Sequence, residues 1–187
     1  MLQNTFQAAL KMVAHAAAKK DIRYYLNGVH LEFSAKGLFV VATDGHRLAV
    51  AGVEGEFADA AVTLGHDAIK QILAVGKSGG EVQVDVAGDA AKVSIGGQVL
   101  QFNGVGGKYP DWRRVVHAEP EATTVVGVNA EYMGQAMSAL SKVANRKYQG
   151  VKIHLRGPNN SLKLEAGLAG DFPGMPEAYC VVMPMRL

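Results

Sequence analysis

The chain has 187 residues, of which 49% are hydrophobic and 19% are charged. A chain with this length and composition can bury a substantial core, which excludes intrinsic disorder. The formal net charge of +2 indicates no partner by itself, and no run of about 18 apolar residues offers a membrane span. The single cysteine, Cys180, cannot close an intrachain disulfide, so we expect a buried thiol in a reducing compartment.

The first predicted element is an amphipathic helix over residues 4–19, with Asn4 as its N-cap. Phe6, Leu10 and Val13 fall on one face of it at helical spacing. Short runs with strand character follow, separated by Ser, Gly and Asp turn residues, at residues 28–33, 37–43 and 47–53.

The same order of elements then recurs twice. The second copy has a strand at 60–64, a helix at 66–75, and strands at 81–86, 91–95 and 99–105. The third has a strand at 123–128, a helix at 129–144, and strands at 151–156, 161–166 and 178–185. The predicted helix starts are 62 and 63 residues apart. We therefore predict three β-α-β-β-β repeats, the first with a short or missing first strand.

One such repeat cannot bury both its helix and its sheet, whereas two repeats can share a core. The sequence therefore predicts a two-repeat domain at 1–122 and a single-repeat half domain at 123–187. We expect the half domain to leave the helix face of Met133, Met137 and Leu140 uncovered. It would then complete itself by pairing with another chain.

Basic residues are concentrated on the predicted helices. Segments 4–20, 66–77 and 129–147 carry eight basic and two acidic residues, and the remainder carries eleven basic and fifteen acidic ones. A solvated helix face is the ordinary interpretation of any one of these segments. Three helices of one sign in successive repeats instead favour sequence-independent contact with nucleic-acid phosphates.

No catalytic pattern stands out. Asp44 and His46 could belong to a hydrolytic set, but the sequence fixes no geometry for it, and a turn is the simpler interpretation. The six histidines lack the spacing of metal ligands. Residues 104–108 (GVGGK) lack the Ser or Thr of a phosphate loop, because Tyr109 follows the lysine. We therefore expect no enzyme activity, no metal and no cofactor.

Four segments, in this order, resemble the beta subunit of bacterial DNA polymerase III, the sliding-clamp family. They are DIRYYLNG at 21–28, ATDGHRLAV at 42–50, YPDWRRV at 109–115 and VVMPMRL at 181–187. The first three resemble the family's middle domain. Residues 145–156 resemble the start of its last domain, and 181–187 resemble its end. The chain departs from the family, which has three two-repeat domains, because the first domain is absent and the last is reduced to one repeat.

The resemblance implies an α+β DNA-clamp fold of one and a half clamp domains, with helices lining a ring and sheets outside. It implies a processivity factor, not an enzyme, that encircles double-stranded DNA in the cytoplasm, at the nucleoid. The candidate DNA contacts are basic or aromatic, and Arg23 and Tyr24 match the family's DNA-contacting loop most specifically. They are Lys11, His15, Lys19, Lys20, Arg23, Tyr24, Lys142, Arg146 and Lys147.

The family also has a hydrophobic pocket that takes short peptides from DNA polymerases and the clamp loader. Leu and Val would form its floor, and Met side chains would adapt to different ligands. The matching positions are Leu26, Thr43, Gly45, His46, Arg47, Leu48, Val181, Val182, Met183, Pro184, Met185, Arg186 and Leu187.

The resemblance implies a ring of twelve repeats, and a chain with three of them predicts a homotetramer. Two alternatives remain open. One is a truncated regulator that competes for clamp-binding peptides without encircling DNA. The other is a small hydrolase or nuclease on an unrelated α+β fold.

Overall fold

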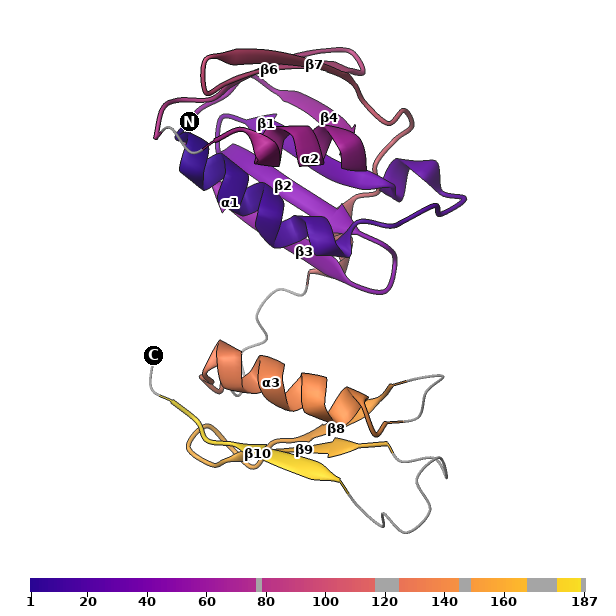
Figure 1. Ribbon diagram of the computed structural model, residues 1–187, viewed down its shortest axis with the longest axis vertical. Coiled ribbons are helices and arrows are strands. Elements are labelled where there is room, and N and C mark those ends of the chain that lie inside the picture. The colour runs from indigo at the N-terminus through magenta and orange to yellow at the C-terminus, as the bar shows by residue number, and fades with distance from the viewer. Residues whose placement is uncertain (77–78, 117–124, 145–148, 168–177, 186–187) are drawn as a thin grey trace. The chain divides into compact units, whose positions relative to one another are not determined.

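The computed structural model describes residues 1–76, 79–116, 125–144, 149–167 and 178–185 (Figure 1). The chain divides into two compact units, Met1–Val116 and His117–Leu187. The fold is a mixed α and β fold in which short helices pack on antiparallel sheets, as the sequence predicts.

The first unit contains two repeats. Its four-stranded sheet has the order β3-β2-β1-β4 and its three-stranded sheet the order β5-β6-β7. The elements are α1 (Gln3–Val13), β1 (Gly28–Ser34), β2 (Gly37–Thr43), β3 (Leu48–Val53), β4 (Ala60–Gly65), α2 (His66–Ala74), β5 (Gln83–Ala87), β6 (Ala90–Ile95) and β7 (Gln98–Asn103).

The two repeats exchange their opening strands. β4 opens the second repeat but pairs antiparallel with β1 of the first, from Gly28 opposite Gly65 to Phe33 opposite Ala60. In return, Leu2 precedes α1 and bridges Glu81, just before β5. Backbone contacts thus run in both directions between the repeats, a full strand from the second and an isolated bridge from the first, and they join the two repeats into one domain.

The core of this unit lies between the helices and the sheets. Phe6, Leu10 and Val13 of α1 are fully buried, which confirms the predicted apolar face. Ile69 and Ile72 of α2 enter the same cluster. α1 and α2 contact each other over the sheet, as Figure 1 shows.

The first helix differs from the prediction at both ends. It begins at Gln3 after Leu2, so Asn4 is not its cap, and no side chain caps it. The Gln3 backbone N–H instead donates to the Gly80 carbonyl at 2.9 Å, so the neighbouring repeat sets where the helix begins. The helix ends at Val13 and a single 3₁₀ turn, Ala14–Ala16, follows. Lys19 and Lys20 consequently lie in a loop.

A buried amide joins the two helices. The Gln7 side-chain nitrogen donates to the carbonyl oxygens of Ile72 and Val75, both at 2.9 Å. These carbonyls belong to the C-terminal end of α2, where no helical N–H is left to bond them. Gln7, 5% exposed, therefore closes the end of the other repeat's helix from inside the core.

The second unit is one repeat. It contains α3 (Ala130–Ser141), β8 (Val151–His154), β9 (Leu162–Ala166) and β10 (Tyr179–Val182), with the sheet order β10-β9-β8. Asn129 caps the helix, because its Oδ1 accepts from the N–H groups of Glu131 at 2.9 Å and Tyr132 at 3.2 Å. This confirms the predicted start of the third helix. Cys180 is half-buried and packs against the same core.

The expected uncovered helix face is wrong. Leu140 is only 3% exposed, and Met133 and Met137 pack half-buried against the core around Leu164 and Val182. The sheet of the same repeat covers this face, so the helix does not need another chain.

Part of the exposed apolar surface of the second unit lies at β8, where Ile153 is 49% exposed, and just beyond it, where Leu155 is 55% exposed. Of the strand predicted at 123–128, residues 123–124 lie outside the described part of the chain. Val128 forms an isolated bridge with Pro184.

Candidate DNA-contact and peptide-binding sites

A closed loop follows the first helix. Its first residue, Lys20, has a left-handed backbone with φ 57°. The Asn27 side chain then accepts from the Asp21 N–H and donates to the Asp21 carbonyl, both at 2.9 Å. Leu26 is tied back to Ala18 by a backbone hydrogen bond of 3.0 Å. These bonds fix residues 20–27 as an ordered surface loop that presents Arg23 and Tyr24 to solvent.

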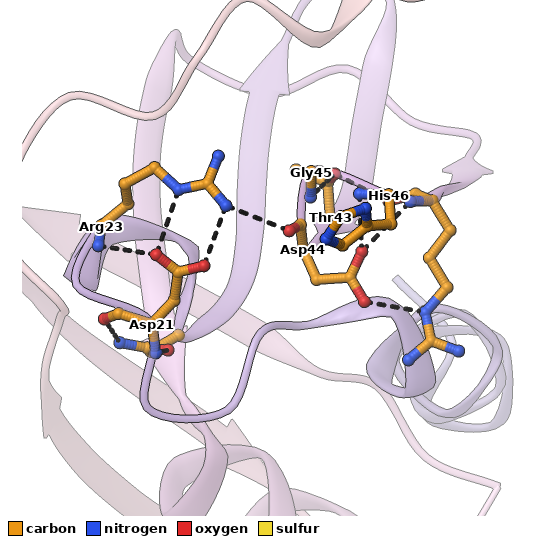
Figure 2. Close-up of polar contacts among 8 residues, drawn as sticks. Asp21, Arg23, Thr43, Asp44, Gly45 and His46 are labelled. Atoms are coloured by element: carbon orange, nitrogen blue, oxygen red, sulfur yellow. Dashed lines mark hydrogen bonds and ion pairs between the residues drawn. The ribbon is translucent and has the colours of Figure 1, made fainter. Parts of the chain in front are cut away.

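Arg23 joins this loop to the next turn (Figure 2). Its guanidinium donates to the Asp21 carboxylate and, at 3.2 Å, to the Asp44 carbonyl. Gly45 lies against it with φ 86°, and a Cβ there would meet the guanidinium at 3.0 Å. The hydrogen bond from Arg23 lowers the pKa of Asp21 to about 2.

The turn at residues 43–47 is held by its own side chains. The Asp44 carboxylate accepts from the N–H groups of His46 at 3.0 Å and Arg47 at 3.1 Å, and from Arg47 Nε at 3.0 Å. These bonds, that from His46 first, lower the pKa of Asp44. The Thr43 hydroxyl donates to the Arg47 carbonyl at 2.7 Å. Asp44 therefore shapes a turn, as the sequence predicts.

An open hollow of about 740 Å³ lies between the end of α1 and this turn. Its two carboxylates, Asp21 and Asp44, are already engaged by hydrogen bonds. The other charged or ionisable side chains around it are all basic types, so the hollow suits an anion such as a phosphate. They are His15, Lys19, Lys20, His46, Arg47 and His66.

The structure brings most of the predicted DNA contacts together. His15, Lys19 and Lys20 line the hollow, and Arg23 and Tyr24 lie on the adjoining loop. Lys11 lies one turn before His15, and all six side chains are exposed. In the second unit, Lys142 is the exposed C-cap of α3. Arg146 and Lys147 lie outside the described residues. Across the described residues, no ion pair involves Lys11, Lys19, Lys20 or Lys142.

The predicted pocket residues of the first unit differ in how far they are exposed to solvent. Leu26 is 2% exposed and packs with Val41, Tyr109 and Trp112, while Leu48 lies half-buried against that cluster. Thr43 is half-buried, and Gly45, His46 and Arg47 are exposed in the turn. Leu26 therefore supports this surface from below.

The C-terminal pocket residues belong to the second unit. Val181, Met183 and Met185 are 52%, 70% and 44% exposed, so they offer apolar surface to a ligand. Val182 is buried in the core of the unit, and Pro184 is half-buried at its bridge to Val128. Arg186 and Leu187 lie outside the described residues.

Sequence reasoning missed the role of the segment at 109–115. Trp112 Nε1 donates to the Glu32 carboxylate at 3.2 Å, and the Arg113 guanidinium donates to both Glu32 oxygens at 3.0 and 2.8 Å. The Arg113 guanidinium carbon lies 4.2 Å from the centre of the Trp112 ring. Tyr109 stacks on His30 with ring centres 4.3 Å apart. This segment covers the outer face of β1 and β2 and completes the cluster that holds Leu26.

The described ranges lack two further features. They contain no group of three or more His, Cys, Asp or Glu side chains arranged to hold a metal ion. They also contain no helix that is long and apolar enough to cross a membrane.

Residues 1–111 match the family model of the DNA polymerase III beta subunit, central domain. The beta sliding clamp of Proteus mirabilis is 30% identical over 168 residues, which are 88% of this chain and 45% of the relative. That of Escherichia coli K12 is 27% identical over 167 residues, 88% of this chain and 44% of the relative.

The crystal structure of the DNA polymerase III subunit beta from Pseudomonas aeruginosa superposes with a TM-score of 0.84 at 27% identity. The superposition covers 98% of this chain and 50% of that one, so this chain spans about half the length of the relatives it matches. The matched central-domain model covers more than half of the residues. The chain therefore belongs to the family of DNA polymerase III beta subunits.

Proposed function

We propose that this chain is a subunit of a DNA sliding clamp, a ring that encircles duplex DNA and tethers replication proteins to it. The observation that supports this proposal most directly is the basic surface at the end of α1. His15, Lys19 and Lys20 line one hollow there, and both of its carboxylates are already occupied. Duplex DNA offers a continuous row of phosphates to such a surface.

The character of this surface suits sliding more than sequence recognition. The lysines are long, exposed and unpaired within the described residues, so their phosphate contacts exchange readily. Phosphate contacts position a protein on DNA but carry no sequence information. A ring held by topology needs only contacts of this weak, exchangeable kind.

Tethering is assigned to a peptide-binding pocket. Within the second unit, Val181, Met183 and Met185 offer flexible apolar surface. Within the first unit, the candidate surface is the turn at 43–47 together with the half-buried Leu48 and the buried Leu26. Pockets that bind several different peptides often use adaptable Met side chains of this kind. The ligands are short apolar peptides of DNA polymerases and of a clamp loader.

Four chains are proposed to form the ring. A family ring has twelve repeats and this chain supplies three. A contact between third repeats and another between first repeats, alternating around the ring, give a closed tetramer with dihedral symmetry. Four copies of the 19.8 kDa chain have a mass of about 79 kDa, which native mass spectrometry resolves from a dimer or trimer.

The exposed Val181, Met183 and Met185 also suit one alternative, a regulator that binds clamp-binding peptides but does not encircle DNA. The two functions differ in topology. A ring on DNA survives high salt until a DNA end is opened, whereas an electrostatic complex dissociates as the salt concentration rises.

The test uses a linear duplex onto which the protein threads from open ends, which are then blocked with streptavidin. We expect the protein to remain on this DNA in about 1 M salt, where counterion release no longer supports binding, and to leave after a restriction cut. Loss in high salt before the cut contradicts encirclement. A monomer that binds only peptides supports the regulator.

A further inference from the structure

We propose that the third repeat pairs with the third repeat of a second copy by exchanging opening strands. The register is the one that joins the first two repeats within a chain. This inference rests on the proposed self-association and specifies the backbone segments that carry it.

The template is the position of β4 in the first unit. On one side β4 pairs with β1 of the other repeat. On its other side the Thr63 carbonyl accepts from the Val105 N–H, which follows β7 of its own repeat, at 2.7 Å. Thr63 lies three residues before the first residue of α2, His66. β4, the opening strand of the second repeat, therefore has two partners, one from its own repeat and one from the neighbouring repeat.

The third repeat reproduces only the contact of the opening segment with its own repeat. The Gly127 carbonyl accepts from the Met185 N–H at 2.9 Å, and Gly127 lies three residues before the first residue of α3, Ala130. Because neighbouring residues of an extended strand direct their polar groups to opposite sides, those of Val126 and Val128 face away from Met185. In the described part of the chain, no backbone group pairs with that side.

β8 has the complementary open edge. The Gly150 carbonyl accepts from the Gly167 N–H at 3.0 Å, so Gly150, Lys152 and His154 face β9. The N–H and carbonyl groups of Val151 and Ile153 then face the open edge, since β8 is the last strand of its sheet.

The side chains give the same indication. Residues 150–155 read GVKIHL, and residues 28–33, which contain most of β1, read GVHLEF. In β1, which pairs with β4 and contacts α2, Leu31 is fully buried and Phe33 is 5% exposed. Their counterparts in the third repeat, Ile153 and Leu155, are 49% and 55% exposed. The third repeat thus lacks the cover that a neighbouring repeat gives to β1.

A second copy of this chain is the occupant that fits both edges. The opening segment lies beyond β10 and β8 lies at the other end of the same sheet, so one chain cannot bring its own two edges together (Figure 1). Two copies related by a two-fold axis make both contacts at once, and none is left open for further growth. The β1·β4 register then places Ile153 opposite Val126, and His154 opposite Val125, of the second copy.

A disulfide tests this register directly. In a Cys180→Ser background, His154→Cys and Val125→Cys would face each other between two chains as a non-hydrogen-bonded pair. The Cα atoms of such a pair are about 4.5 Å apart, within disulfide reach. The matched control, Lys152→Cys with Val125→Cys, is two residues out of register, at about 7–8 Å. We expect mild oxidation to yield a covalent dimer from the first protein and its loss in the control. Equal yields, or no dimer from either protein, overturn the proposal.

A proline pair gives an independent readout in the 187-residue chain. Ile153→Pro removes an N–H that faces the open edge of β8, where proline is tolerated in a folded edge strand. Tyr179→Pro is the control on β10, because the Ala178 carbonyl bonds Ala166 and the Tyr179 N–H therefore faces away from β9. We expect Ile153→Pro to halve the native mass and Tyr179→Pro to leave it unchanged. An unchanged mass for folded Ile153→Pro overturns the strand exchange, and if that variant does not fold, the disulfide decides.

These readouts are separate from the clamp function. If the cross-link forms only in the predicted register but the protein leaves end-blocked DNA in high salt, the strand exchange is supported and the clamp function is contradicted. If the protein stays on the DNA but the cross-link does not form, the clamp function is supported and the strand exchange is contradicted.

Discussion

The Arg23 guanidinium donates to both oxygens of the Asp21 carboxylate, 3.0 Å from Nε to Oδ1 and 2.8 Å from its terminal nitrogen to Oδ2. The cation that matches the family's DNA-contacting loop most specifically is thus neutralised by an acid two residues away. Its side chain is still 46% exposed, so a phosphate could reach it in competition with Asp21.

The first prediction concerns this competition. Asp21→Asn keeps an acceptor for the Arg23 backbone N–H but removes the charge, so DNA binding at low salt should strengthen. The dependence of binding on salt should steepen by about one phosphate contact, because Arg23 is then free to pair. Fluorescence anisotropy with duplex DNA over a salt series measures both. The control, Asp89→Asn in the exposed β5–β6 hairpin, makes the same change in net charge. An equal gain in the control would assign the effect to net charge alone.

The second prediction concerns the lysines. Changing Lys11, Lys19 and Lys142 to Glu should weaken DNA association without unfolding either unit, because all three are exposed. The difference from the parent should shrink as salt rises, and each lost contact should lower the slope of log K against log salt by about 0.9. If the triple variant binds as well as the parent at low salt, the contact surface is misplaced.

The third prediction concerns peptide binding. Met185→Ala should weaken a clamp-binding peptide by about 1–3 kcal/mol if the peptide's anchor contacts it. Isothermal titration calorimetry measures this. The control is Met12→Ala, another exposed Met, which lies on α1. Leu26→Asp is a poor test, since Leu26 is 2% exposed and a charge there would unfold the cluster around it. Identical peptide affinity in Met185→Ala and the parent would remove Met185 from the pocket.

The fourth prediction concerns pH. Burial lowers the pKa of His30 to about 4, below its ordinary value of 6.5. The unfolded chain therefore takes up a proton between pH 6.5 and 4 that the folded chain does not. Stability should fall as pH falls through this window, by at most about 1.4 kcal/mol per pH unit from this residue. Urea unfolding at pH 7, 6 and 5 should show a smaller fall for His30→Gln than for the parent. His46→Gln, at an exposed turn position, is the control and should behave as the parent does.

Three carboxylates affect the stability of the folded chain over a lower pH range than His30 does. The pKa values of Asp21, Asp44 and Glu32 are all lowered by their hydrogen-bonded partners. Their contribution to stability is present above their ordinary pKa values and is lost as pH falls through the lowered ones. The His30 effect therefore appears first on acidification and can be measured separately.

The fifth prediction concerns Trp112. It is 9% exposed, and its indole N–H donates to the carboxylate of Glu32, which lies 80 residues earlier in the chain. Trp112→Ala should cost about 3–5 kcal/mol of unfolding free energy in the first unit. Circular dichroism during urea unfolding measures this. The exposed Val99→Ala on β7 should change stability by less than about 0.5 kcal/mol. A small effect for Trp112→Ala would show that residues 109–115 add little to the cluster.

Local signals predicted much of the fold. β2 occupies the predicted residues 37–43, because a continuous apolar run ends there at Asp44 and Gly45. Asn129 caps its helix, because an Asn before an apolar periodic run satisfies two orphan N–H groups. The exchange of β4 and β1 could not be predicted in this way, since both partners have the same alternating pattern that any antiparallel pairing would satisfy.

The candidate site was predictable as a set of residues but not as an arrangement. The sequence predicts Lys19 and Lys20 on a helix, because the alanines favour its continuation and nothing local signals its end, whereas in the structure both lysines follow the 3₁₀ turn at Ala14–Ala16. The pairing of Glu32 with Arg113 depends on a contact between residues 81 apart, for which no sequence spacing rule exists. The burial of Leu26 beneath the surface could not be predicted either, because it depends on Tyr109 and Trp112, which lie more than 80 residues later in the chain.

The amide of Gln7 has a consequence for how the first unit denatures. Its two hydrogen bonds end on carbonyls of the other repeat, so α2 cannot fray at its C-terminus without leaving a buried donor unpaired. Neither helix can detach while the other stays ordered. Hydrogen exchange in α1 and in the last turn of α2 should therefore report one shared opening free energy. We therefore expect the two repeats of the first unit to unfold as a single cooperative unit.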